Sequence, residues 1–162
     1  MTARARGGLQ DARIDWESVH AVLLVDHVTR QLDRAAYNIH FRERRLTGVG
    51  GSGPETLLVA LALDNENCFG RVKDNGPDDG VRLKNLVRWA AQRRDPDPLA
   101  MTFSQRLQRG LQQIDVEAWS SDLVGLLGQR DFNPSIARLS RVKEAGLMAI
   151  IPQLAYCCPF PP

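Results

Sequence analysis

The 162-residue chain contains no long hydrophobic run. Its longest uninterrupted apolar stretch is the seven-residue segment from Leu57 to Leu63, whereas a membrane-spanning helix needs about 20 apolar residues. Arg4 and Arg6 make the N-terminus basic, but polar and charged residues follow where a signal peptide would carry its apolar segment. We therefore expect a cytoplasmic protein without a membrane span.

Cysteine and histidine are scarce, at three residues each. The cysteines form no CxxC pair, and their odd number argues against a disulfide framework. Cys68 lies beside Phe69 in an apolar pattern, which is typical of an inert buried thiol. His20, His27 and His40 show neither the HxxxH spacing nor the carboxylate partners of a zinc or di-iron site. We therefore expect no catalytic residue, no metal and no cofactor, which favours a non-enzymatic protein over an enzyme.

Lysine is also scarce, since it supplies only three of the 21 basic residues and arginine supplies the others. With 19 acidic residues the formal net charge is +2, so no basic field covers the whole domain. Arginine is well suited to phosphate oxygens, and one local cluster contains Arg30, Arg34, Arg42, Arg44 and Arg45. On a helix these side chains form a ridge, interrupted by acidic residues, that is suited to a phosphate backbone. A nucleic-acid-associated helical protein is therefore one alternative function.

The spacing of apolar residues in the N-terminal half predicts two helices. No Gly or Pro occurs between Ile14 and Leu46, and apolar residues recur there at spacings near 3.6, as in a long amphipathic helix. Ser52, Pro54 and Glu55 are typical of a helix start, because Ser caps, Pro suits an early helical position and Glu completes a capping box. The second helix is expected to begin there.

Further helical stripes follow in the rest of the chain, near residues 83–94, 103–114, 116–127 and 133–147. Thr102 and Gln105 resemble a capping box, Asp115 suits an N-cap and Pro134 suits a helix start. We therefore expect a mainly α-helical protein, built as a compact bundle of about six helices. A single domain at 14–152 is expected after a flexible N-terminus at 1–13.

Two short apolar runs leave the secondary structure ambiguous. Residues 20–25 and 57–63 have the length and composition of buried strands, and periodicity alone does not separate a short buried strand from a buried helix. A strand at 20–25, followed by Asp26 and a helix, is how a doubly wound α/β chain often begins. A small α/β domain is therefore the alternative fold.

The segment 46–57 is rich in glycine. Gly48 and Gly53 have the separation found in the phosphate-binding loop of P-loop NTPases, which this segment resembles. In that family backbone N–H groups hold the phosphates, and a Lys followed by Ser or Thr completes the site. Pro54 and Glu55 stand at those two positions here. A nucleotide-binding domain or enzyme with a degenerate P-loop is the second alternative function.

The C-terminal segment 153–162 is rich in proline and apolar residues. Proline does not continue a helix, so we expect an extended tail. The tail either packs on its own domain or binds a partner, as Pro-rich segments do. The residues it would present are Tyr156, Cys157, Cys158 and Phe160. Apolar helical stripes and helix caps are plentiful in this sequence, whereas each candidate catalytic or metal site lacks at least one of its required residues. The sequence therefore predicts a non-enzymatic protein-interaction or regulatory domain, with a protein partner or self-association.

Overall fold

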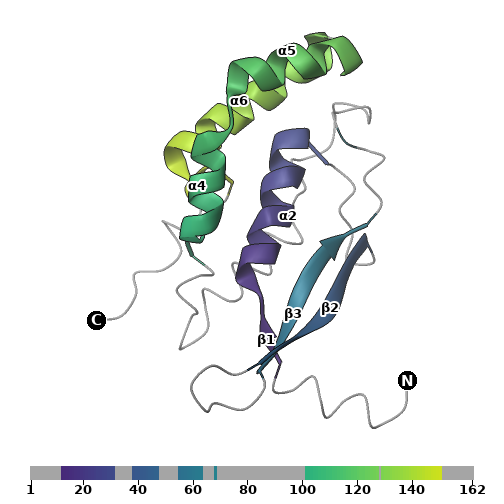
Figure 1. The fold of residues 1–162 in the computed structure, drawn as a ribbon. Helices are drawn as coiled ribbons and strands as arrows, with labels where there is room; N and C mark the ends of the chain where they lie inside the picture. Colours follow the sequence, from purple (N-terminus) through teal and green to yellow (C-terminus); the bar gives the residue numbers. More distant parts are fainter. Residues whose placement is uncertain are drawn as a thin grey trace.

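The structure, a computed structural model, describes residues 12–31, 38–47, 55–63, 68, 101–127 and 129–150. Within this part the chain forms five helices and one three-stranded sheet (Figure 1). In chain order the elements are β1 (Arg13–Ile14), α2 (Trp16–Thr29), β2 (Ile39–Leu46), β3 (Glu55–Ala62), α4 (Gln105–Gln113), α5 (Val116–Leu127), α6 (Gln129–Ala145) and α7 (Leu147–Ile150). The predicted six-helix bundle is therefore wrong, and the alternative, a small α/β domain, fits the structure.

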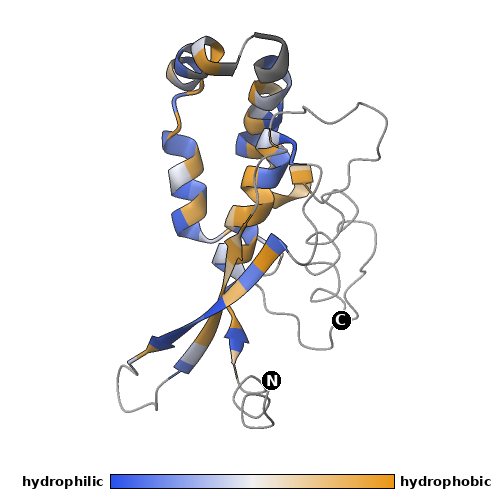
Figure 2. Cartoon of the chain, turned by 90° about the vertical axis from the view of Figure 1, so that its right-hand side faces the viewer, coloured by the Kyte–Doolittle hydropathy of each residue, from blue (hydrophilic) through white to orange (hydrophobic). Residues whose placement is uncertain are grey.

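The sheet is mixed and has the strand order β1-β3-β2. β1 runs parallel to β3, whereas β2 runs antiparallel to β3 with Leu46 opposite Glu55. The strand expected at 57–63 is thus confirmed as β3, but the strand expected at 20–25 is wrong because these residues lie in α2. The Leu46–Glu55 end of the β2–β3 ribbon extends away from the helices, with hydrophilic residues of β2 beside the largely hydrophobic β3 (Figure 2).

Of the two helices predicted for this region, the first is confirmed only as far as Thr29 and the second is wrong. The helix expected at 14–46 ends at Thr29, where Arg30 adopts the left-handed conformation with a φ of 53°. The helix expected to begin at Ser52 is replaced by strand β3. Each strand alone has an ambiguous pattern, but antiparallel pairing satisfies the backbone groups that the two strands turn toward each other. Tertiary pairing therefore overrides a helical spacing that was only a local preference.

The first turn of α2 continues the edge of the sheet where β1 stops. β1 pairs with β3 only as far as Ile14, which lies opposite Leu58. The next backbone N–H, that of Asp15, donates to the Leu58 carbonyl at 3.0 Å. Beyond it the Ser18 hydroxyl accepts the Ala60 N–H at 2.8 Å and donates to the Asp15 carbonyl at 2.7 Å. The helix start therefore supplies the hydrogen bonds that a longer β1 would have supplied.

Helix α2 forms the centre of the core. It lies between the ribbon and helices α6 and α7 and contacts β3, α6 and α7 (Figure 1). Its Val19 and Leu23 side chains are 0% and 2% exposed, and Val142 of α6 is 0% exposed. Ala60 of β3 is buried in the same cluster. Burial of these apolar groups couples the sheet to the helical part of the domain.

The helices predicted at 103–114 and 116–127 agree with α4 and α5. The α4 N-cap is Ser104, whose hydroxyl accepts the Leu107 N–H at 3.1 Å. The Asp115 carboxylate caps α5 by accepting two backbone N–H groups at 3.0 Å. Leu111 of α4 is buried in the core, as the predicted stripe requires. The predicted cap at Asp115 is therefore confirmed, whereas the capping box predicted at Thr102 is wrong, because the cap of α4 is Ser104, two residues later.

Helix α6 begins at Gln129, before the predicted start at Asn133, and contains Pro134. Its C-terminal half carries Leu139 and Val142 into the core. The predicted helix near 83–94, the first eleven residues and the tail at 153–162 lie outside the described residues.

Gly146 ends α6 in the left-handed conformation, with a φ of 60°. A Cβ at this position meets no atom within 4 Å, so the cost of a side chain is conformational. We predict that Gly146→Ala lowers the free energy of unfolding by about 1 kcal/mol, measured by urea unfolding. The matched substitution Gly110→Ala in α4, which also meets no atom within 4 Å, should raise it by about 0.5–1 kcal/mol. Effects of the same sign would contradict this assignment.

Candidate interaction site

Strand β2 lies at one edge of the sheet and is exposed along its length. Its eight residues include only one half-buried side chain, Ile39, and the others are exposed. Its inner side pairs with β3, and within the described part of the chain no strand pairs with its outer side. An edge of this length is a template for the pairing of another extended segment.

The pairing with β3 determines which backbone groups of β2 face outward. The Leu63 N–H donates to the Asn38 carbonyl at 2.8 Å, and continuing the β2–β3 register places these two residues opposite each other. Hydrogen-bonded and non-hydrogen-bonded pairs alternate along an antiparallel ladder, so the even-numbered residues of β2 bond to β3. The backbone groups that point away from the sheet belong to Ile39, Phe41, Glu43 and Arg45.

The bonds on the far side of β3 confirm this alternation. The Leu58 carbonyl and the Ala60 N–H, both of even-numbered residues, point toward β1 and α2. The odd-numbered residues of β3 therefore bond to β2. Among the described residues, none donates to or accepts from the outward groups of β2. This outer edge of β2 is the candidate interaction site.

The side chains of β2 form two faces, because successive residues of a strand point to opposite sides. We call one side the basic face; it consists of His40, Arg42, Arg44 and Leu46. We call the other side the mixed face; it consists of Ile39, Phe41, Glu43 and Arg45. On the basic face the cross-strand neighbours of Arg42 and Arg44 are Val59 and Leu57. The two faces therefore offer different chemistry to anything that binds along the edge.

The five arginines predicted to form a helical ridge do not share a helix face. Arg42 and Arg44 lie on the basic face of β2, and Arg45 lies on the mixed face. Arg30 is the C-cap of α2, and Arg34 lies outside the described residues. The helix face on which that prediction depended is replaced by a strand. Among the described residues, the basic face is the part of this cluster on which a nucleic-acid function could rest.

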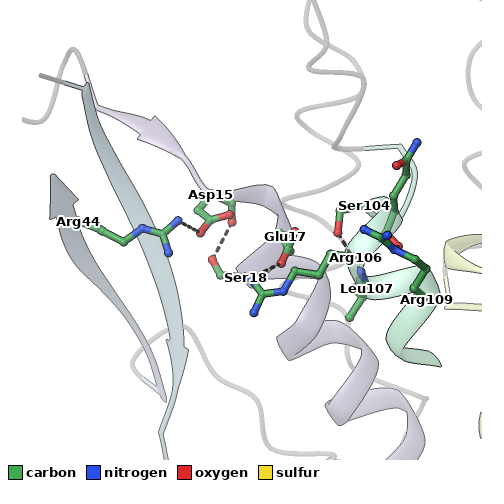
Figure 3. A network of polar contacts seen from close by, with 9 residues as sticks. Asp15, Glu17, Ser18, Arg44, Ser104, Arg106, Leu107 and Arg109 are labelled. Atoms are coloured by element: carbon green, nitrogen blue, oxygen red, sulfur yellow. Dashed lines mark hydrogen bonds and ion pairs between the residues drawn. The ribbon is translucent and has the colours of Figure 1, made fainter. Parts of the chain in front are cut away.

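Ion pairs neutralise part of the charge near the basic face (Figure 3). The Arg44 guanidinium lies 3.1 Å from the Asp15 carboxylate, and Arg13 lies 2.9 Å from Glu55. These pairs are partly exposed, so each contributes no more than about 1 kcal/mol to stability. No ion pair of Arg42 occurs among the described residues. Arg42 is thus the cation of this face that is available to an incoming anion.

A groove of about 560 Å³ adjoins the basic face, between α2, α4 and β3. Its charged rim carries the Arg44–Asp15 pair and a second pair, in which Arg106 of α4 lies 3.5 Å from Glu17 of α2 (Figure 3). Apolar side chains such as Leu24 also line it. Since each of these arginines faces a carboxylate, the groove carries little net charge of either sign.

Catalytic groups do not converge in the described residues. His20 is 1% exposed and packs between Trp16 and Phe103, with ring centroids 6.4 and 5.7 Å away. His40 is exposed on β2, and the half-buried Cys68 accepts a hydrogen bond from Thr29 at 3.4 Å. No group of three or more His, Cys, Asp or Glu side chains in the described part is arranged to hold a metal ion. His20 is thus part of the core, whereas His40 faces solvent.

The other predicted sites fall largely outside the described residues. Residues 48–54 of the P-loop-like segment are among these, but the residues that follow form strand β3 from Glu55. A P-loop is followed by a helix whose N-terminus faces the phosphates, and that element is a strand here. The tail residues Tyr156, Cys157, Cys158 and Phe160 also lie outside the described part.

The edge strand was not among the predicted sites. The signal that identifies it is the alternation of Ile39 and Phe41 with His40 and Arg42, a period of two residues. That signal spans only the first half of β2, and it competed with apolar residues spaced near 3.6 over a longer window. Sequence alone also does not specify which side of a strand remains unpaired.

Comparison with protein-family models, with curated proteins and with solved structures found no match. Among the helices described, none is both long enough and apolar enough to cross a bilayer.

Proposed function

We propose that this protein is a non-enzymatic interaction domain that binds an extended segment of a partner protein along the outer edge of β2. The observation that supports it is the row of outward backbone groups on an exposed eight-residue edge strand. In strand addition, main-chain hydrogen bonds supply affinity and alternate side chains supply specificity. Both requirements correspond to features of β2.

A second copy of the chain is a poor occupant of this edge. Only outward residues can form hydrogen-bonded pairs with another strand, so an antiparallel pairing of two β2 strands places one residue opposite its own copy. The central registers bring Arg42, Glu43 or Arg44 against itself. Like charges directly opposite each other destabilise a strand pair. The charges therefore oppose self-association through this edge and favour a different partner.

The proposal is tested by removing one outward N–H. Glu43→Pro deletes a donor that faces away from β3, and proline is tolerated at such positions on edge strands. Glu43→Ala is the matched variant, since it removes the same charge and keeps the N–H. We expect peptides selected on the wild-type protein from a random phage-displayed library to bind Glu43→Ala nearly as well. Their affinity for Glu43→Pro should fall by about tenfold or more, because lost hydrogen bonds and a blocked ladder act together.

Circular dichroism and urea unfolding of the Glu43→Pro variant control for the fold. If no peptide is enriched, or if the enriched peptides bind the two Glu43 variants equally, strand addition at β2 is incorrect.

A further inference from the structure

We infer that the segment bound at β2 is an acidic strand in which carboxylate side chains alternate with apolar ones. This inference rests on the proposed function and specifies the chemistry of the partner. It follows from three observations on β2: the direction of its backbone groups, the different chemistry of its two faces, and the ion pairing of its arginines.

The backbone geometry determines where a bound strand places its side chains. An antiparallel strand on the outer edge forms hydrogen-bonded pairs with Ile39, Phe41, Glu43 and Arg45. Its non-hydrogen-bonded pairs are then with His40, Arg42 and Arg44. Opposite side chains lie closer together in non-hydrogen-bonded pairs. The closest cross-strand contacts of a bound strand are therefore with the basic face.

The basic face selects carboxylates. Arg42 and Arg44 are consecutive members of this face and are both exposed, Arg44 with 55% of its side chain. Arginine presents a planar fork that matches a carboxylate, and opposite charges stabilise a cross-strand pair. Arg42 has no carboxylate partner among the described residues, whereas Arg44 shares Asp15. A bound acidic side chain is thus stabilised most by pairing with Arg42.

The mixed face selects apolar residues. Ile39 and Phe41 are apolar, and Phe41 is 43% exposed, so part of its ring is available to a cross-strand neighbour. Aromatic and β-branched residues form favourable cross-strand pairs. Glu43 on the same face repels a carboxylate placed opposite it. A strand that carries acids on one side and branched apolar residues on the other therefore matches both faces, and the flipped orientation does not.

The experiment uses the full chain and fluorescence anisotropy with a labelled eight-residue peptide that alternates Glu and Val, the length of β2. A peptide that alternates Lys and Val, and one with the same Glu and Val content in blocks, are the comparison probes. We expect the alternating acidic peptide to bind more tightly than both. Arg42→Gln should weaken it by about two- to fivefold, as for the loss of one opposite-charge cross-strand pair.

Arg45→Gln is the matched control, because it removes the same charge from the mixed face. We expect it to change the affinity of the acidic peptide by less than Arg42→Gln does. We also expect Glu43→Pro to abolish binding of this peptide, with Glu43→Ala measured beside it as the matched variant. Equal effects of the two arginine variants would indicate general attraction to charge and would overturn the inference.

The remaining outcomes separate the inference from the proposed function. If acidic and basic peptides bind equally and Glu43→Pro blocks both, the edge binds strands but the acidic specificity is wrong. If neither the acidic nor the basic peptide binds while library peptides still require the Glu43 N–H, the edge again binds strands and the acidic specificity is wrong. If a single-stranded oligonucleotide binds instead, with loss on Arg42→Gln and none on Glu43→Pro, the basic face recognises phosphates and the inference is overturned.

Discussion

Leu23→Ala is expected to lower the free energy of unfolding by about 2–5 kcal/mol, the range for truncating a fully buried leucine. Leu23 is 2% exposed at the centre of α2, where the sheet and helices α6 and α7 meet. Truncation removes buried apolar area and leaves a cavity that rigid neighbours fill only in part. A stability of only about 5–15 kcal/mol is typical of a domain, so the loss should be evident as a lower midpoint in urea.

Leu126→Ala is the matched control for this prediction. The Leu126 side chain, near the end of α5, is 78% exposed, and alanine is a strong helix former. We expect a change within about 0.5 kcal/mol. If the two leucine variants lose similar stability, the core is not centred on α2.

Ser18→Ala is expected to lower the free energy of unfolding by about 1–3 kcal/mol, the cost of leaving a buried donor without a partner. The Ser18 hydroxyl accepts the Ala60 N–H at 2.8 Å, and Ala60 is 5% exposed, so water does not replace the hydroxyl freely. Urea unfolding measures the loss. Amide hydrogen exchange should also show faster exchange at Ala60, a change that a general loss of helix stability would not confine to one residue.

Ser121→Ala on the exposed surface of α5 is the control for this substitution. It removes the same hydroxyl from a helix without a buried partner and should be near neutral. An unchanged exchange rate at Ala60 in Ser18→Ala would mean that the helix start does not protect the edge of β3.

Ser18 links stability to the candidate site through β3. One edge of β3 is completed by β1 and by the first turn of α2, and the other edge is completed by β2. β2 contributes few buried side chains of its own, since only Ile39 is half-buried. Its conformation therefore depends on the ladder to β3. A variant that loosens β3 should weaken strand addition at β2 as well as stability, whereas Glu43→Pro should affect mainly binding.

Much of the helical part of the domain could be predicted from the sequence. Asp115 is followed by apolar residues at helical spacing, and a cap together with a stripe specifies both the start and the buried face of a helix. The α4 stripe around Leu111 and the α5 cap accordingly agree with the structure, whereas α4 is capped by Ser104 and not by the expected Thr102. Such information is local, because it depends on residues within a few turns of one another.

The sheet and the candidate site could not be predicted from the sequence in the same way. Residues 39–46 and 57–63 fit either periodicity, and the choice depends on a partner strand that lies on the other side of a glycine-rich segment. Without that pairing Arg42 and Arg45 are placed on one helical ridge, whereas in the strand they point to opposite faces.

By itself the sequence determined the absence of a long apolar run, the near balance of charge, the apolar stripe of α4 and the helix capped by Asp115. These properties depend on composition and on short-range hydrogen bonds. Only the tertiary structure decided that residues 39–46 form an edge strand, and which backbone groups and which arginines of that strand face outward. The reason is physical: strand pairing is a contact between separate segments, and its alternation assigns every group of β2 to one side or the other.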